Sequence, residues 1–351
     1  MTKIDIFSGF LGAGKTTLIK KLIKEAYAGE KLVLIENEFG EIGIDGGFLQ
    51  DAGIEITEMN SGCICCSLVG DFSKALAKVL DEFHPDRVII EPSGVGKLSD
   101  VIKAVQSVEA EDATLNCFTT VADVNKCKMY MKNFGEFYND QIANASCIVL
   151  SHTDVAKAHK AEETVELIRK HNADATIVTT PWDKLDGKDI LAAMEKKDTL
   201  DSALEELEEE HKHHKHHHHG HHHHHDEECH CHEHHEHHHH DHGEHCSCGC
   251  HDHDHHHHHA DEVFTSFGCE TAKKFTVEGI QNALETFSED DSFGMVLRAK
   301  GIVEGEDGEW IHFDYVPAEP NVRHGAAGVI GRLCVIGSNL DNDKIKEIFG
   351  L

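Results

Sequence analysis

The chain has 351 residues, thirteen cysteines and a formal net charge of −32. Its length exceeds what one hydrophobic core usually holds and favours two domains of ordinary size. Because binding to phosphate backbones requires a basic face, the charge argues against nucleic acid as a partner and favours cations instead.

The amino terminus predicts a cytoplasmic protein. It reads "MTKIDIFSGFLGAGKTT", a short strand and a Gly-rich turn, where a secretory signal would have a basic head and a long apolar stretch. No apolar run approaches the roughly 18 to 20 residues needed to cross a bilayer, so we expect no membrane partner. In a reducing compartment the cysteines indicate metal binding or buried thiols, and we expect Cys117, Cys147 and Cys334 to be buried.

Strand and helix patterns alternate through the first 205 residues. An amphipathic helix over Thr16 to Tyr27 separates the apolar runs "KIDIF" and "KLVLIE", and a second helix ends at Phe83. Further strands are predicted in "HPDRVIIE", "LNCFTTVAD", "CIVL" and "ATIV". This alternation predicts an α/β fold with a mostly parallel sheet, helices on both of its faces, and ligands at the carboxyl ends of its strands.

The first motif fits the phosphate-loop pattern G-x-x-x-x-G-K-[ST] between a strand and a helix. Its glycines let successive N–H groups turn toward the phosphates, and the helix amino terminus adds a favourable dipole. We expect Lys15 to reach the outer phosphates as a catalytic residue and the Thr16 hydroxyl to coordinate Mg²⁺. The nucleotide-binding residues predicted here are Gly9, Gly12, Ala13, Gly14, Lys15, Thr16 and Thr17.

Three cysteines lie close together in "GCICCSL". In an extended chain Cys63 and Cys65 point one way and Cys66 the other, but Gly62 permits a turn that gathers three thiolates around one ion. With no obvious fourth ligand, the site keeps an open coordination position, which suits a metal that must be released. Sulfur ligands favour Zn²⁺ or Cu(I) over Mg²⁺ and Ca²⁺. The alternative is that one or two of these cysteines only pack in a core.

Two further strand ends complete the predicted nucleotide site. Glu91 ends an apolar strand, where its carboxylate can organise Mg²⁺ as a second catalytic residue, and the N–H of Gly94 can sense the γ-phosphate. Asp154 follows "CIVLSHT" and can accept the guanine N–H donors, although Ser151 and His152 replace the Asn and Lys of an N-K-x-D motif. The cysteines lie between the phosphate loop and Glu91, so we expect the metal and nucleotide sites to be coupled.

A histidine-rich tract, residues 211–259, holds most of the 35 histidines and follows an acidic segment. It has no aliphatic or aromatic core residues, so we expect a disordered linker over residues 206–261. Its histidine and cysteine side chains favour binding of Zn²⁺, Ni²⁺ or Co²⁺. The tract therefore suits a metal buffer or an arm that collects metal ions. The ligands predicted there are Cys229, His230, Cys231, Cys246, Cys248 and Cys250.

Residues 262–351 predict a small α+β domain. Strands are expected in "VFTSFG", "GMVLRAKGIV", "WIHFDY" and "RLCVIG", with a final helix ending at Phe349. A helix between the first two strands presents Val277, Ile280, Leu284 and Phe287 on one apolar face.

The motifs "SGFLGAGKTTL", "IENEFGE", "GCICC", "EPSG" and "TDV" resemble, in this order, the CobW family of P-loop GTPases. The stretch from "VLRAKGIV" to "RLCVIGSNL" resembles the carboxy-terminal domain of that family. The resemblance covers the chain apart from the histidine-rich tract. In the "IENEFGE" stretch, we expect one of Glu36, Glu38 and Glu41 to add a metal or Mg²⁺ ligand, and we assign this role to Glu41. The alternative is that the stretch is a solvated acidic turn.

The resemblance implies a GTP hydrolase with slow intrinsic turnover that acts as a metallochaperone. It would bind GTP with Mg²⁺, carry Zn²⁺, or Co²⁺ or Ni²⁺, and transfer the metal to a client apoprotein. The chain would act either alone or as a homodimer. Two alternatives belong to other classes: a metal storage protein that uses the histidine-rich tract, and a P-loop kinase or ATPase with incidental metal binding.

Overall fold

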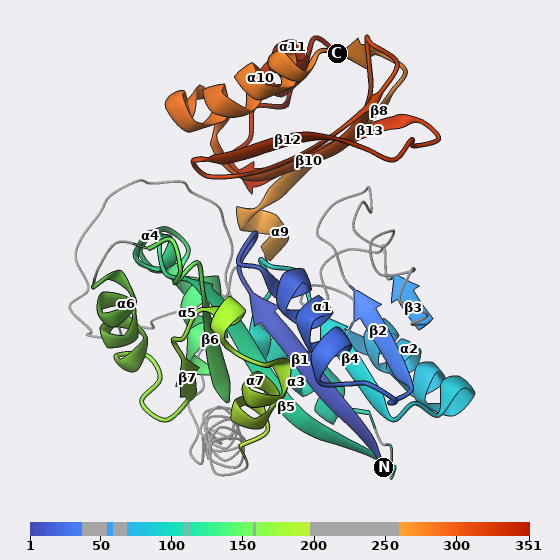
Figure 1. The fold of residues 1–351 in the computed structure, drawn as a ribbon, viewed down its shortest axis with the longest axis vertical. Helices are drawn as coiled ribbons and strands as arrows, with labels where there is room; N and C mark the ends of the chain where they lie inside the picture. The colour runs from blue at the N-terminus through green and yellow to red at the C-terminus, as the bar shows by residue number, and fades with distance from the viewer. Residues whose placement is uncertain (37–54, 59–68, 109, 111, 157–158, 197–259) are drawn as a thin grey trace, which may run out of the picture.

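The computed structural model describes residues 1–36, 55–58, 69–108, 110, 112–156, 159–196 and 260–351. They form two units, each built on its own sheet, with the short helix α9 (Ala260–Val263) between them (Figure 1). The expected linker ends at 261, whereas α9 already begins at Ala260, whose side chain is buried in the core that the two units share.

The first unit contains a seven-stranded sheet among the described residues, in the order β3-β2-β4-β1-β5-β6-β7. Every neighbouring pair is parallel. This confirms the predicted parallel α/β sheet. Its strands are β1 (Thr2–Gly9), β2 (Leu32–Glu36), β3 (Glu55–Glu58), β4 (Arg87–Glu91), β5 (Ala113–Asp123), β6 (Cys147–Ser151) and β7 (Thr176–Val178).

Helices cover both faces of this sheet (Figure 1). One face packs against α1 (Lys15–Glu25) and α7 (Gly187–Met194), with the 3-10 helix η3 (Trp182–Lys184) near them. The other packs against α2 (Val69–Phe83), α3 (Leu98–Gln106), α4 (Cys127–Asn133), α5 (Gly135–Ala143) and α6 (Lys160–Arg169). No helix among the described residues is long and apolar enough to span a membrane.

Burial on both faces explains why the strands read as continuous apolar runs. Neighbouring residues of β1 enter opposite cores: Ile6 packs on the side of α2 and α3, and Phe7 on the side of α1 and α7. Both side chains are fully buried. Such a strand has no polar face, as expected for a parallel sheet covered on both sides.

The second unit is an α+β domain, as predicted. Its sheet has the order β12-β11-β10-β13-β8, and the short strand β9 pairs with β10. The elements are β8 (Thr265–Thr271), β9 (Lys274–Phe275), α10 (Val277–Glu289), η4 (Asp291–Phe293), β10 (Met295–Gly305), β11 (Trp310–Val316), β12 (Glu319–Gly325), β13 (Gly331–Ser338) and α11 (Asn342–Phe349). Both helices lie on one face (Figure 1).

The prediction for α10 holds for Ile280, Leu284 and Phe287, which are buried against the sheet. It is wrong for Val277, which is 39% exposed. Val277 is the first residue of the helix, directly after the Thr276 cap, and no preceding turn places it over the sheet.

The opposite face of the second sheet packs on the first unit. Leu297, Cys334 and Ile336 join the core of the first unit, so the two units share buried apolar surface. Phe264, directly after α9, packs its ring against Phe10 with centroids 6.0 Å apart. These contacts fix the second sheet over the carboxyl edge of the first.

A buried ion-pair network lies inside the first unit, away from this interface. The guanidinium of Arg87 contacts the fully buried carboxylate of Asp5 and, at 2.6 Å, the carboxylate of Glu30. Tyr27 donates its hydroxyl to Asp5 at 3.1 Å and lies under the guanidinium. Burial opposes the charge of Arg87, but the surrounding carboxylates keep its pKa above the ordinary value. The network ties β1 to β4.

We predict that Arg87→Met lowers the free energy of unfolding by about 3 to 5 kcal/mol, because it leaves the buried Asp5 carboxylate without its cation. Lys78→Met is the matched control, since it removes an exposed ion pair with Glu82 at 3.7 Å, outside the network, and should cost less than about 1 kcal/mol. Urea unfolding measures both. Equal costs for the two variants would show that the buried network contributes no more than a surface pair.

Candidate functional site

The phosphate loop, residues 9–16, connects β1 to α1. Gly9 and Gly12 have φ angles of 139° and 71°, a region that favours glycine. A Cβ on Gly9 would meet the carbonyl oxygen of Val121 at 2.5 Å. The Lys15 ammonium donates to the carbonyl oxygen of Gly9 at 2.9 Å, so the lysine lies folded across its own loop.

Thr16 and Glu91 meet in front of this loop. The Thr16 hydroxyl donates to the Glu91 carboxylate, with oxygen–oxygen distances of 3.1 and 3.3 Å. Thr16 is the second residue of α1 and Glu91 the last residue of β4. Two hard oxygen donors side by side are the ligand type that Mg²⁺ prefers. The residues predicted to hold Mg²⁺ therefore fit that ion.

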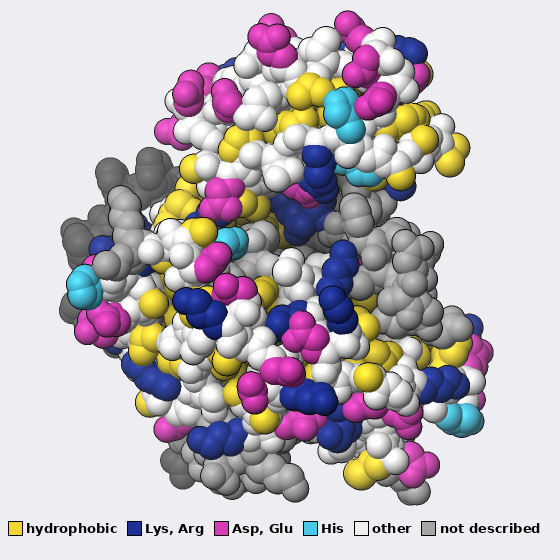
Figure 2. All heavy atoms as spheres, in the orientation of Figure 1, with side chains coloured by type: hydrophobic (Ala, Val, Ile, Leu, Met, Phe, Trp, Pro, Cys, Tyr) yellow, Lys and Arg dark blue, Asp and Glu magenta, His cyan; other side chains and the backbone are white. Residues whose placement is uncertain are grey.

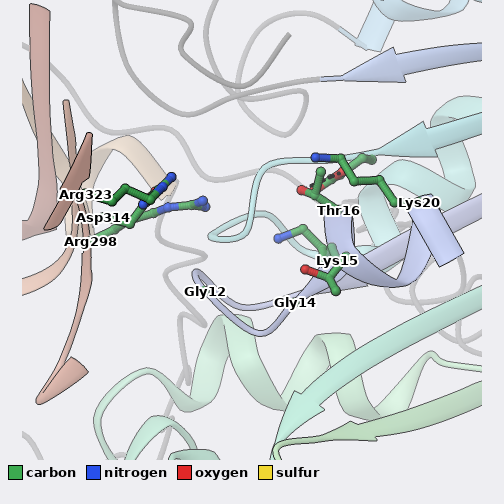
Figure 3. A pocket seen from close by; sticks show the side chains of 10 residues that line it. Gly12, Gly14, Lys15, Thr16, Lys20, Arg298, Asp314 and Arg323 are labelled. Carbon is green, nitrogen blue, oxygen red and sulfur yellow. Dashed lines mark hydrogen bonds and ion pairs between the residues drawn. The ribbon is translucent and has the colours of Figure 1, made fainter. Parts of the chain in front are cut away.

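A hollow of about 300 Å³ opens at the phosphate loop. Figure 3 shows residues of both units facing it, and Figure 2 shows Lys and Arg side chains gathered around the space between the units. Its lining is Gly12, Gly14, Lys15, Thr16, Thr17, Lys20, Glu91, Arg298, Asp314 and Arg323. Six predicted residues therefore lie together here, whereas Gly9, Ala13, Gly94 and Asp154 are not part of this lining.

Gly94 lies behind the loop. A Cβ there would come within 2.9 Å of the Leu11 backbone nitrogen, so the segment after Glu91 approaches the phosphate loop closely. Gln141, fully buried on α5, donates its amide to the carbonyl oxygens of Gly94 and Gly96 at 3.0 and 2.8 Å. No sequence motif indicates Gln141, because its role depends on where α5 packs.

The region after β6 departs from a standard guanine motif. Asp154 is exposed in the turn that follows the strand. His152 has a φ of 57° and places its Nδ1 3.2 Å from the buried Asp123 at the end of β5. Hydrogen bonding to Asp123 raises the pKa of His152, and burial partly opposes the rise. His152 therefore stands beside Asp123 at the position where N-K-x-D motifs carry lysine.

Trp182 is a second residue that the motifs did not indicate. Its indole N–H donates to the Leu150 carbonyl oxygen at 2.9 Å, and its ring lies 3.2 Å from where a Cβ on Gly14 would stand. The feature of the sequence that could have indicated Trp182 is a tryptophan in the short turn after the last strand of the first unit. It fixes η3 against the start of α1.

The predicted transition-metal ligands lie outside the described residues. These are Cys63, Cys65, Cys66, Glu41, Cys229, His230, Cys231, Cys246, Cys248 and Cys250. Within the part of the chain that the structure describes, no three His, Cys, Asp or Glu side chains gather as a metal site. Cys117, Cys147 and Cys334 are buried, as predicted.

Comparison with known proteins gives matches for both units. Residues 3–179 match the CobW/HypB/UreG nucleotide-binding domain, and residues 264–350 match the cobalamin synthesis protein cobW C-terminal domain. The zinc chaperone YeiR of Escherichia coli is 30% identical over 188 residues, 53% of this chain and 57% of YeiR.

The zinc-regulated GTPase metalloprotein activator 1 of Schizosaccharomyces pombe is 28% identical over 192 residues, covering 52% of this chain and 46% of the relative. This chain thus spans about half the length of the curated relatives it matches. The crystal structure of the Zn(II)-bound YjiA GTPase from E. coli aligns with 99% of this chain and 98% of its own, with a TM-score of 0.40 and 20% identity.

The pair formed by His152 and Asp123 predicts a pH-dependent stability. Because the pKa of His152 is raised in the folded state, its contribution is fully present below about pH 6.5 and is lost as pH rises through the folded pKa. Glu319 adds to the rise and Lys126 opposes it.

His152→Gln should therefore lower the free energy of unfolding more at pH 6 than at pH 8.5, measured by urea unfolding at both values. His171→Gln, a change at an exposed histidine beyond α6, is the control. A loss that is the same at both pH values would contradict the assigned protonation.

Proposed function

Because the chain belongs to the CobW/HypB/UreG family of nucleotide-binding proteins, we propose that it is a GTPase that delivers a transition metal, zinc first, to a client apoprotein. The observation that carries this proposal is the convergence of Lys15, Thr16 and Glu91 on one hollow at the phosphate loop. Zinc is favoured because relatives at 28–30% identity are named zinc chaperone and zinc-regulated GTPase. Cobalt and nickel remain alternatives for the cargo.

In this proposal the nucleotide lies along the phosphate loop with its outer phosphates in the hollow. Lys15 leaves the Gly9 carbonyl oxygen, to which it now donates, and donates to the phosphates instead. The N–H groups of residues 12–17 face the phosphates at the start of α1. Asp154 accepts from the guanine ring, with His152 and Trp182 beside that part of the site.

Thr16 and Glu91 would hold Mg²⁺, which when bound neutralises charge on the outer phosphates. In hydrolysis the oxygen of a water forms a bond to the γ-phosphorus as the bond to the β,γ-bridging oxygen breaks, and GDP leaves with that electron pair. Gln141 holds Gly94 so that its backbone lies beside the phosphate loop. From there the N–H of Gly94 would sense the γ-phosphate. We propose slow intrinsic turnover, because none of the described residues is assigned to orient the attacking water.

The metal is the cargo of this cycle. We propose that Cys63, Cys65 and Cys66 hold it for transfer, with Glu41 as a further ligand, and that the tract of residues 211–259 collects it through ligands such as His230 and Cys231. The chain would act in the cytoplasm on an apoprotein client, alone or as a homodimer. The carboxy-terminal domain is the proposed docking unit for that client.

The sheet edge supports a link between the two sites. Glu36 lies opposite Glu91 in the pairing of β2 with β4, and opposite Glu58 in the pairing of β2 with β3. The carboxyl ends of these strands therefore share one edge, and the segment that carries the cysteines begins directly after Glu58. Glu91 and the start of that segment are therefore only two strands apart along this edge of the sheet. A change at Glu91 on nucleotide binding would act close to that start.

We predict that Lys15→Ala weakens binding of a non-hydrolysable GTP analogue about a hundredfold, because it removes a charge-assisted contact to the phosphates. Deleting residues 211–259 should leave this affinity unchanged. In a zinc-transfer assay with an apoprotein client, Lys15→Ala should abolish nucleotide-dependent transfer while the deletion only reduces the amount of zinc carried. Transfer that survives Lys15→Ala and is lost on the deletion would favour the storage alternative.

Glu91→Gln tests the proposed Mg²⁺ ligand. We predict that the variant still binds GDP without Mg²⁺ as well as the unaltered chain, because Glu91 would act on the nucleotide through Mg²⁺. The Mg²⁺ concentration that half-saturates GTP hydrolysis should rise at least about tenfold, since one anionic ligand becomes neutral. An unchanged Mg²⁺ dependence would remove Glu91 from the site.

A further inference from the structure

The hollow at the phosphate loop has an unusual charge for this chain. Its lining includes four cationic side chains and two acidic ones, although the chain as a whole carries a formal net charge of −32. Two of the cations, Lys15 and Lys20, come from α1, and the other two, Arg298 and Arg323, come from the second unit. A concave, positively lined site in an acidic protein fits an anionic ligand.

The two arginines project from the second sheet toward the first unit. Arg298 is on β10 and Arg323 on β12, and β11 lies between these strands. Figure 3 shows both side chains extending from the sheet toward the phosphate loop. The second unit therefore presents two guanidinium groups to the place where the proposed function puts the phosphates.

Arg323 is held in this direction by its neighbours. Its Nη1 forms an ion pair with Oδ2 of Asp314 at 2.7 Å and donates a hydrogen bond to Oδ1 of Asn321 at 2.9 Å. Both contacts use the same nitrogen, so Nε and Nη2 keep their donors for a further acceptor. Asp314 thus acts as a positioning residue, on the strand between the two arginines.

The second sheet also approaches the loop itself. A Cβ added to Gly12 would overlap the Cγ1 of Val316, the last residue of β11. Lys126, after β5, forms an ion pair with Glu319 at the start of β12, at 2.9 Å. Together with the shared core around Phe264, these contacts hold the arginines at a fixed distance from the loop.

We propose that Arg298 and Arg323 bind the outer phosphates of the nucleotide, so that the phosphate chain is held between the two units. This inference rests on the proposed function, since it requires a nucleoside triphosphate in the phosphate loop. The planar guanidinium presents paired N–H donors that match phosphate oxygens, and its charge opposes the negative charge that develops during phosphoryl transfer. The carboxy-terminal unit then distinguishes GTP from GDP through the γ-phosphate.

Equilibrium binding of fluorescent nucleotides to the full chain with Mg²⁺ tests the proposal. Arg298→Gln and Arg323→Gln are each expected to weaken binding of a non-hydrolysable GTP analogue about tenfold, with a change in GMP affinity of less than about threefold. Arg323→Lys keeps the charge and should recover part of the loss. Arg332→Gln, on β13 of the same sheet and outside the hollow, is the matched control and should bind like the unaltered chain.

Arg298 is half-buried, so its substitution can unfold the protein. The thermal unfolding midpoint of each variant is therefore measured first, without nucleotide. If Arg298→Gln unfolds, the test is decided by the variants of the exposed Arg323. Analogue affinities equal to that of the unaltered chain, with Lys15→Ala still defective, would overturn the inference and leave the proposed function in place. An equal loss for GMP would overturn it too, because the arginines would then act on the fold. If the unaltered chain binds no GTP analogue, both the inference and the proposed function fail.

Discussion

The burial of Phe10 is the constraint on which the arrangement of the two units depends. This residue is the second of the phosphate loop, yet its side chain is fully buried. Its ring lies 4.4 Å from that of Tyr130 and 6.0 Å from that of Phe264, so the loop, α4 and the start of the second unit meet in one aromatic cluster. Each such pair contributes about 0.5 to 1.5 kcal/mol beyond the burial of its surface. The backbone of the phosphate loop is thereby anchored to the unit that faces it.

The same constraint connects the nucleotide to the rest of the protein. A phosphate that draws Lys15 away from Gly9 would act on the whole loop. Within that loop, Phe10 packs on Phe264 and Gly12 lies against Val316. On the other side, Thr16 is bonded to Glu91, at the sheet edge where the segment with the cysteines begins. The proposed nucleotide would therefore touch elements that lead both to the carboxy-terminal unit and to the proposed metal site. By linkage, a nucleotide that changes metal affinity must have its own affinity changed by the metal to the same extent.

The sequence predicted the parallel sheet, the phosphate loop and the approach of Glu91 to Thr16, because these depend on local periodicity and on motifs whose spacing fixes their geometry. It did not indicate Gln141, Trp182, Arg298 or Arg323. Their positions relative to the loop result from packing between segments far apart in the chain, and an arginine on a strand looks the same in sequence whether it faces solvent or a phosphate. The exposure of Val277 was missed for a related reason, since helical periodicity does not tell where a helix overhangs its sheet. The departure at Ser151 and His152 was visible, but its partner Asp123 was not.

The proposed function requires that nucleotide occupancy changes the affinity for metal, which chelator competition for Zn²⁺ measures. The measurement uses the chain without residues 211–259, with Mg²⁺ and either GDP or a non-hydrolysable GTP analogue, and compares it with Cys65→Ala. We expect zinc affinity to differ between the two nucleotide states and the difference to disappear in Cys65→Ala. Equal zinc affinity with GDP and with the analogue would contradict it.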